Sequence, residues 1–207
     1  MRISELSAAS GVPLPTVKYY LREGLLHPGE QLAATRAEYD ETHLRRLRLI
    51  RALLEVGKLP VASIKKVIEA VDDHSLPVHT MLGTAHYALA GEVPSATQDP
   101  EWDSAQAEVD QLISAFGWRI ESWAPPRAEL TEILSRMRKL GMKPDLRPYA
   151  EAADKLVTEV EMNQISFDGP RDAAVEALVL GTILYGRAFD ALRRLAQESE
   201  SARRLAP

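Results

Sequence analysis

The stretch that decides the fold is residues 3–26, which read ISELSAASGVPLPTVKYYLREGLL. Ile3 and Leu6 recur at helical spacing, Gly11 supplies a turn, and a second short helix is expected over about residues 14–23. A helix-turn-helix needs small residues where its helices touch, a glycine at the turn, and a second helix short enough to enter the major groove. This stretch meets all three requirements, so it predicts a DNA-binding element.

The chain changes character after this stretch. Residues 27–39 lack helical periodicity and contain a proline and a glycine, which favours a small hairpin. Asp40 can then cap a third helix, Gly57 ends that helix, and Pro60 opens a fourth. Two helices, a hairpin and a further helix are the elements of a winged helix-turn-helix.

The N-terminal residues resemble the MerR family of regulators. Its members carry a Gly-Val turn, a Thr-Ile-Arg-Tyr-Tyr-like run, a Gly-Leu-Leu segment, a wing and a further helix. The counterparts here are Gly11-Val12, Thr16-Val17-Lys18-Tyr19-Tyr20, Gly24-Leu25-Leu26, Thr35-Arg36-Ala37-Glu38-Tyr39 and Asp40-Glu41-Thr42-His43-Leu44-Arg45-Arg46-Leu47. The wing has one extra residue and no Gly-Tyr pair, and Lys18 replaces the usual arginine. The resemblance covers residues 1–71 and implies a regulator that binds promoter DNA.

Several side chains of this region have the chemistry needed at DNA. Hydroxyl, ammonium, phenol and guanidinium groups reach phosphates and base edges. The candidate DNA-binding residues are Thr16, Lys18, Tyr19, Arg22, Arg36, Lys58 and Lys65. Two alternatives stay open: Tyr19 packs on the wing, and the two lysines around Pro60, which resemble the family's second wing, are simply solvated. Tyr20 is expected in the core.

Composition limits the function classes. The chain has 207 residues and no cysteine, which removes disulfides, thiolate metal sites and cysteine nucleophiles. No leader and no apolar run long enough to span a bilayer is recognised, so a cytoplasmic protein without membrane contact is expected. Residues 1–72 hold 11 Lys and Arg against 9 Asp and Glu, and residues 73–207 hold 14 against 21. The N-terminal part is therefore the better partner for nucleic acid.

The chain is predicted to be all-α, with a small β wing and two domains. Residues 1–72 form the winged helix-turn-helix, and residues 73–207 form an all-helical dimerisation and effector-binding domain. The break between them falls at about residues 72–77. The second domain is loosely similar, in its number of helices, to the ligand and dimer domain of TetR-type regulators.

A long last helix is expected from about residue 171 to residue 199. Small and apolar residues repeat along it at alternating spacings of three and four, which favours close packing against another helix in register. The candidate dimer-interface residues are Ala174, Ala177, Gly181, Leu184 and Ala188. The alternative is that this helix is the buried centre of its own domain.

Aromatic residues are the candidates for an effector site. They are Trp102, Trp118, Trp123, Tyr149 and Tyr185, and the alternative is that they are ordinary core residues. Any effector is expected to be a small organic molecule, since soft metals need thiolates. His74, His79 and His86 have a poor spacing for a metal, so no metal site and no cofactor is expected.

These observations favour a transcriptional regulator that binds an inverted-repeat operator in promoter DNA as a homodimer and acts on RNA polymerase indirectly. No catalytic motif rises above chance, so an enzyme is not expected. Two alternatives remain open: a DNA-architectural protein that bends DNA without sensing a ligand, and an enzyme whose helical domain carries the chemistry.

Overall fold

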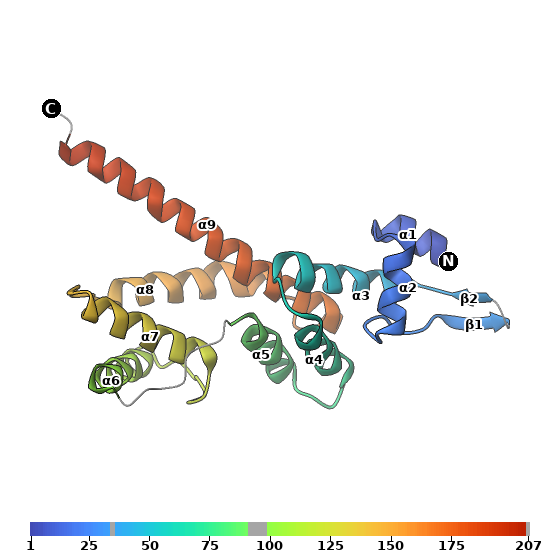
Figure 1. The fold of residues 1–207 in the computed structure, drawn as a ribbon, viewed down its shortest axis with the longest axis horizontal. Coiled ribbons are helices and arrows are strands. Elements are labelled where there is room, and N and C mark those ends of the chain that lie inside the picture. The colour runs from blue at the N-terminus through green and yellow to red at the C-terminus, as the bar shows by residue number, and fades with distance from the viewer. Residues whose placement is uncertain (34–35, 91–98, 206–207) are drawn as a thin grey trace. The chain divides into compact units, whose positions relative to one another are not determined.

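A computed structural model describes residues 1–33, 36–90 and 99–205. In these ranges the protein is helical apart from one two-stranded sheet, which confirms the predicted fold class (Figure 1). None of the described helices is both long and apolar enough to cross a membrane. The chain forms two compact units: a first unit of Met1–His86 with Gln164–Pro207, and a second unit of Tyr87–Asn163.

The first unit contains the winged helix-turn-helix and the last helix. Its elements are α1 (Ile3–Ser10), α2 (Leu14–Arg22), β1 (Glu30–Ala33), β2 (Arg36–Glu38), α3 (Glu41–Arg51), the π-helical turn η1 (Ala52–Val56), α4 (Val61–Asp72), most of α5 (Val78–Leu89) and α9 (Arg171–Leu205). The third helix ends at Gly57 as expected, but its last turn widens into η1. The last helix continues to Leu205, beyond the expected end.

Local sequence explains the start of this unit. Gly11 has a φ of 68°, in the left-handed region that glycine adopts without a steric cost, and this residue ends α1. Asp40 caps α3, because its side chain accepts hydrogen bonds from the backbone N–H groups of Thr42 and His43. The strands β1 and β2 pair antiparallel, with Glu30 opposite Glu38.

The last helix packs against the helices that follow the hairpin in the same unit. It contacts α3, η1 and α4, and its residues Ala174, Val175 and Val179 are buried there. The sequence boundary at residue 72 stays a prediction, but the described contacts place α9 with the N-terminal residues. The core of the first unit is therefore built from both ends of the chain.

The second unit is a separate helical cluster. It holds α6 (Pro100–Ala115), α7 (Pro125–Lys139), α8 (Arg147–Leu156) and the π-helical turn η2 (Val157–Glu161), and the 3-10 turn η3 (Met162–Gln164) follows. Ala105, Val109 and Leu134 form its small core. Arg127 on α7 also binds Asp110 on α6, through two hydrogen bonds of 2.7 Å. Apolar packing and this paired charge hold α6 and α7 together.

Candidate nucleic-acid interface

The helix α2 divides its side chains between the core and solvent. Val17 and Tyr20 are buried, which confirms the predicted position of Tyr20 in the core, and burial raises the pKa of the Tyr20 hydroxyl. The rest of its surface carries four of the candidate residues, namely Thr16, Lys18, Tyr19 and Arg22. A short helix with one buried face and one polar, cationic face in solvent has the surface that major-groove docking requires.

The hairpin supplies the wing. Arg36 begins β2, in register with Ala33 on β1, and the register shifts between Gln31 and Ala33. Thr35, which precedes Arg36 in the family-like run, lies outside the described residues. The position of Arg36 on a strand of this hairpin is the placement that the sequence predicts, and its contact with DNA stays a prediction.

The two lysines around Pro60 lie in different surroundings. Lys58 is exposed and has a φ of 55°, the only positive φ of a non-glycine residue among those described. Such backbone costs on the order of 1–3 kcal/mol and is concentrated at functional sites. Lys65 instead forms an ion pair with Glu23, with 2.9 Å between Nζ and Oε2. Lys58 is thus the more exposed cation, while the ion pair of Lys65 links α4 to the end of α2.

Supporting contacts fix the helix-turn-helix on the unit. The Arg51 guanidinium on α3 donates a 3.4 Å hydrogen bond to the Ser10 carbonyl at the end of α1. The same group forms two hydrogen bonds with Glu55, which raise its pKa and lower that of Glu55. Sequence reasoning missed Arg51, because a contact across 41 residues leaves no spacing signature.

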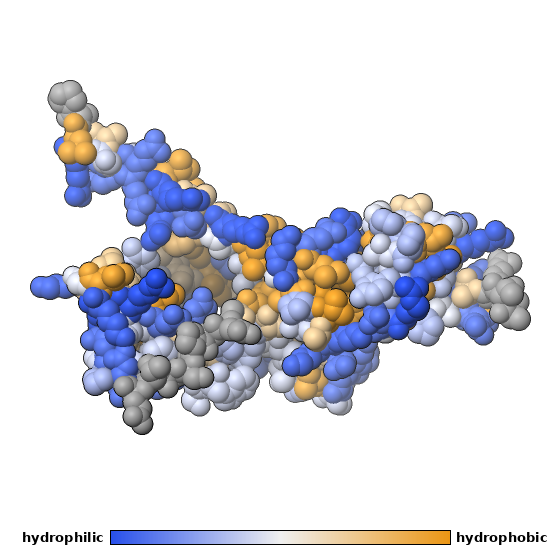
Figure 2. All heavy atoms as spheres, viewed as in Figure 1, coloured by the Kyte–Doolittle hydropathy of each residue, from blue (hydrophilic) through white to orange (hydrophobic). Residues whose placement is uncertain are grey.

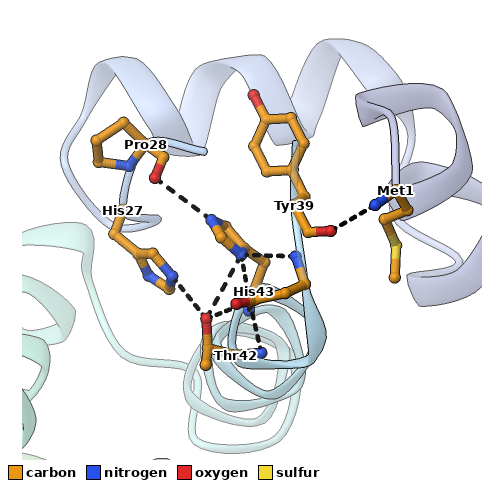
Figure 3. A network of polar contacts seen from close by, with 7 residues as sticks. Met1, His27, Pro28, Tyr39, Thr42 and His43 are labelled. Carbon is orange, nitrogen blue, oxygen red and sulfur yellow. Dashed lines mark hydrogen bonds and ion pairs between the residues drawn. The ribbon is translucent and has the colours of Figure 1, made fainter. Parts of the chain in front are cut away.

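The start of α3 closes the base of the wing. The backbone N–H of Tyr39 donates to the Met1 carbonyl at 2.8 Å, and the Met1 amino group donates to the Tyr39 carbonyl at 2.7 Å (Figure 3). Hydrogen bonds from Thr42 and His43 hold the pKa of the Asp40 carboxyl far below its usual value. Burial lowers the pKa of His27, and the nearby His43 lowers it further. The wing is anchored to α3 through polar groups at its two ends.

The candidate effector residues do not form one group. Four belong to the second unit, and Tyr185 lies on α9 in the first. Trp102 is buried and its indole N–H donates to Gln106, whereas Trp123 is 67% exposed and packs edge-on against Tyr87. The other two differ as well, since Trp118 donates to Asp154 at 2.8 Å and Tyr149 is exposed.

The second unit does contain a cleft, with a volume of about 250 Å³. Its lining residues are Glu108, Val109, Gln111, Leu112, Ala115, Asp145, Leu146 and Arg147. None of the five aromatic candidates is among these lining residues. An effector site formed by the aromatic residues therefore stays a prediction.

The candidate dimer residues are spread over two environments on α9. Ala174 is buried within the first unit, Ala177 and Gly181 are half-buried, and Leu184 and Ala188 are exposed. Further apolar side chains are exposed beyond them, namely Tyr185, Phe189, Leu192 and Leu195. Figure 2 shows hydrophobic residues recurring along this part of the helix. The alternative interpretation, in which α9 is the buried centre of a domain, fits only the first part of the helix.

The sequence and the fold are similar to those of known regulators. The family model described as MerR HTH family regulatory protein matches residues 1–71. The crystal structure of the candidate transcriptional regulator SCO5550 from Streptomyces coelicolor A3(2) matches with 38% identity and a TM-score of 0.77, over 100% of this chain and 99% of that one. The chain belongs to the MerR family. It is accordingly a DNA-binding transcriptional regulator, as the N-terminal residues predict.

Two curated relatives match over shorter ranges. The nodulation protein NolA of Bradyrhizobium sp. (strain NC92) is 35% identical over 121 residues, which are 56% of this chain and 49% of NolA. The HTH-type transcriptional regulator ZntR homolog of Haemophilus influenzae is 36% identical over 50 residues, 24% of this chain and 37% of the relative. The chain thus covers less than half the length of either of these relatives.

Proposed function

We propose that this MerR-family regulator binds an inverted-repeat operator in promoter DNA as a homodimer. The observation that carries the proposal is the division of α2 into a buried face and a polar face with exposed Lys18, Tyr19 and Arg22. In this proposal α2 enters the major groove, while Arg36 on the wing and Lys58 beyond η1 contact the flanking backbone. Lys65 contributes less, since its charge is paired with Glu23.

The second protomer of the dimer contacts the second half-site of the operator. One winged helix-turn-helix contacts a single half-site, and linking two gains affinity through effective concentration. Helix α9 has 35 residues and is therefore about 52 Å long. Beyond Gly181 it exposes Leu184, Tyr185, Phe189, Leu192 and Leu195. A row of large apolar side chains on one helix is best covered by the same helix of a second copy.

A small organic effector is the finer part of the proposal. The lining of the cleft in the second unit combines the apolar side chains of Val109, Leu112 and Leu146 with polar and charged ones. Apolar walls with a few polar groups are typical of small-molecule sites. In this proposal the effector binds in this cleft and alters how the bound dimer presents the promoter to RNA polymerase. Tryptophan fluorescence with a panel of organic compounds tests this part separately.

DNA titration tests the main proposal. Lys18→Ala and Arg36→Ala should each weaken operator binding by about 1–3 kcal/mol, and Lys143→Ala, an exposed lysine of the second unit, is the matched control. Fluorescence anisotropy on DNA selected from a random library measures this. The affinity should also fall steeply with salt, because cations at phosphates release counterions. Unchanged affinity in both folded variants would overturn the interface, and equal affinity for all sequences would favour an architectural role.

A further inference from the structure

A polar cluster of different chemistry lies where the wing meets α3. His27 precedes β1, Asp40 follows β2, and His43 is in the first turn of α3. One potential ligand atom from each of these residues lies within 4.8 Å of the other two (Figure 3). In contrast to the expectation of no metal site from the sequence, we propose that this cluster binds one divalent transition-metal ion of the zinc type, through His27 Nε2, Asp40 Oδ1 and His43 Nδ1.

The orientation of His43 supports a ligand role. Its Nε2 lies 3.4 Å from the Pro28 carbonyl, to which it can donate its ring proton. A histidine that ligates a metal almost always donates its other ring N–H to a carbonyl or carboxylate in this way, which fixes its tautomer. The His43 side chain is buried, and its ring lies 3.9 Å from the His27 ring and 5.0 Å from the Tyr39 ring, centroid to centroid. Its Nδ1 is therefore held toward Asp40.

The pair of His43 Nδ1 and Asp40 Oδ1 favours a shared cation. These atoms are 2.8 Å apart, so a proton on Nδ1 can lie between them, and in the tautomer with the ring proton on Nε2 both atoms are acceptors that a metal ion can bridge. The carboxylate oxygen already accepts hydrogen bonds from the Thr42 N–H at 2.9 Å and the Thr42 hydroxyl at 2.5 Å. In that tautomer Nδ1 accepts the backbone N–H of Asp40 at 3.1 Å, and a cation bound to Nδ1 and Oδ1 would replace this contact and remove the repulsion between the two acceptors.

The Thr42 hydroxyl marks the position of the ion. It lies 2.9 Å from His27 Nε2 and 2.5 Å from Asp40 Oδ1, between the donor atoms. Zinc binds nitrogen and oxygen ligands at about 2.0–2.2 Å, so two ligands of one ion lie at most about 4 Å apart. The exposed Thr42 side chain can turn aside, and a small rotation of His27 then completes the site. Water takes the remaining coordination position.

The donor set selects the type of metal. Two imidazoles and one carboxylate suit zinc, nickel and copper, whereas calcium and magnesium prefer oxygen ligands alone. The chain has no cysteine, so thiolate-seeking metals have no preferred ligand here. The cluster shares no residue with the candidate DNA contacts.

The ion would join the two ends of the wing to α3. His27 and Asp40 flank the hairpin that carries Arg36, and His43 belongs to the helix on which the hairpin rests. Fixing both ends reduces the freedom that the wing loses when it binds DNA, so metal should tighten operator binding. This consequence rests on the proposed function, whereas metal binding itself does not.

Calorimetry on the chelator-treated full-length protein tests the site, with zinc chloride as the probe. We expect one ion per chain and at least a tenfold loss of affinity in His27→Ala and in His43→Gln. Glutamine at this third helical position retains a capping side chain, so the second variant should fold. His74→Ala and His79→Ala, which remove exposed histidines outside the cluster, should bind as the wild type does. Thr42→Ala should bind as tightly or more tightly.

Two further readouts complete the test. Zinc should raise the melting temperature of the wild type and of His74→Ala but not of His27→Ala, and cobalt should give the visible spectrum of a site without thiolates. Equal zinc affinity in wild type, His27→Ala and His43→Gln, or no binding, would overturn the site. Zinc that binds without changing operator affinity would overturn its role in the wing. An operator affinity that is absent with and without zinc would count against the proposed function instead.

Discussion

The two halves of α9 share one continuous helix but lie in opposite surroundings. In the first half, Ala174, Val175 and Val179 are at most 3% exposed, because they pack on the first unit. In the second half, large apolar residues such as Leu192 and Leu195 are more than 60% exposed. The same pattern of small and apolar residues thus serves packing within the chain in one half and leaves an uncovered apolar surface in the other.

Polar contacts account for much of this difference. Arg171 donates to four backbone carbonyls at the end of α4 and just beyond it, those of Ala70, Val71, Asp73 and Leu76. Beside it, Asp172 accepts a 2.8 Å hydrogen bond from the buried Arg46, which also pairs with Asp72. The ion pairs of the second half join neighbouring turns of α9, as between Asp190 and Arg194. The first half is anchored by long-range contacts, whereas the ion pairs described for the second half lie within the helix itself.

The largest effect, on the free energy of unfolding, is expected from removing the ion pairs of Arg46 with Asp72 and Asp172. Arg46→Ala leaves the Asp72 and Asp172 carboxylates without their partner, so it should lower the free energy of unfolding by about 3–5 kcal/mol. Arg22→Ala, which removes an exposed arginine of α2 away from α9, should change it by no more than about 0.5 kcal/mol. Urea unfolding followed by circular dichroism measures both. Equal stability of the two variants would mean that apolar packing alone holds the first half of α9.

The next effect concerns the exposed half. Leu192→Glu together with Leu195→Glu should weaken dimerisation by about 100-fold or more, because burial of each leucine contributes about 1.5–3 kcal/mol. The free energy of unfolding of the monomer should stay the same, since both side chains are exposed within one chain. Sedimentation velocity over a range of concentrations measures the association. Arg193→Gln is the control, and a dimer that persists in the double variant would place the interface elsewhere.

A smaller effect is expected at the junction of the halves. A Cβ added at Gly181 would meet only Tyr185 Cδ2, at 3.8 Å, so one chain can accept a side chain there. Gly181→Leu should therefore weaken dimerisation by roughly tenfold through overpacking between chains, and stabilise the monomer by up to about 1 kcal/mol. Gly186→Leu, at an open position off the small-residue stripe, is the matched control. If both substitutions weaken the dimer equally, the stripe is not the contact surface.

The smallest effect depends on pH. Partial burial raises the pKa of Glu176 on the anchored half, although Arg48 opposes the shift. A carboxyl with a raised pKa in the folded state contributes stability at low pH that is lost as pH rises through that value. Glu176→Gln should therefore melt roughly 1 °C above the wild type at pH 7, and the difference should close below about pH 4.5. Calorimetry measures it, and a difference independent of pH would exclude titration as its cause.

The sequence by itself determined the features whose causes are local. Gly11 produces the turn, Asp40 caps α3, and the alternation along α2 sends Tyr20 inward and Lys18 outward, each within a few residues of the chain. Secondary structure and the helix-turn-helix follow from such short-range preferences of the backbone and of apolar spacing. For that reason the family could be predicted from the first third of the chain, and the all-α class from the helical spacing along the rest.

Tertiary structure alone decided which distant groups meet. Arg46 and Arg48 have the same side chain on the same helix, yet only Arg46 is buried, because it reaches Asp172 across 126 residues. His27 and His43 come together only when the hairpin folds back, and no spacing rule marks them. Which part of α9 is buried likewise depends on where α3 and α4 end in space. Contacts of this kind depend on how the chain closes long loops, which local patterns do not encode.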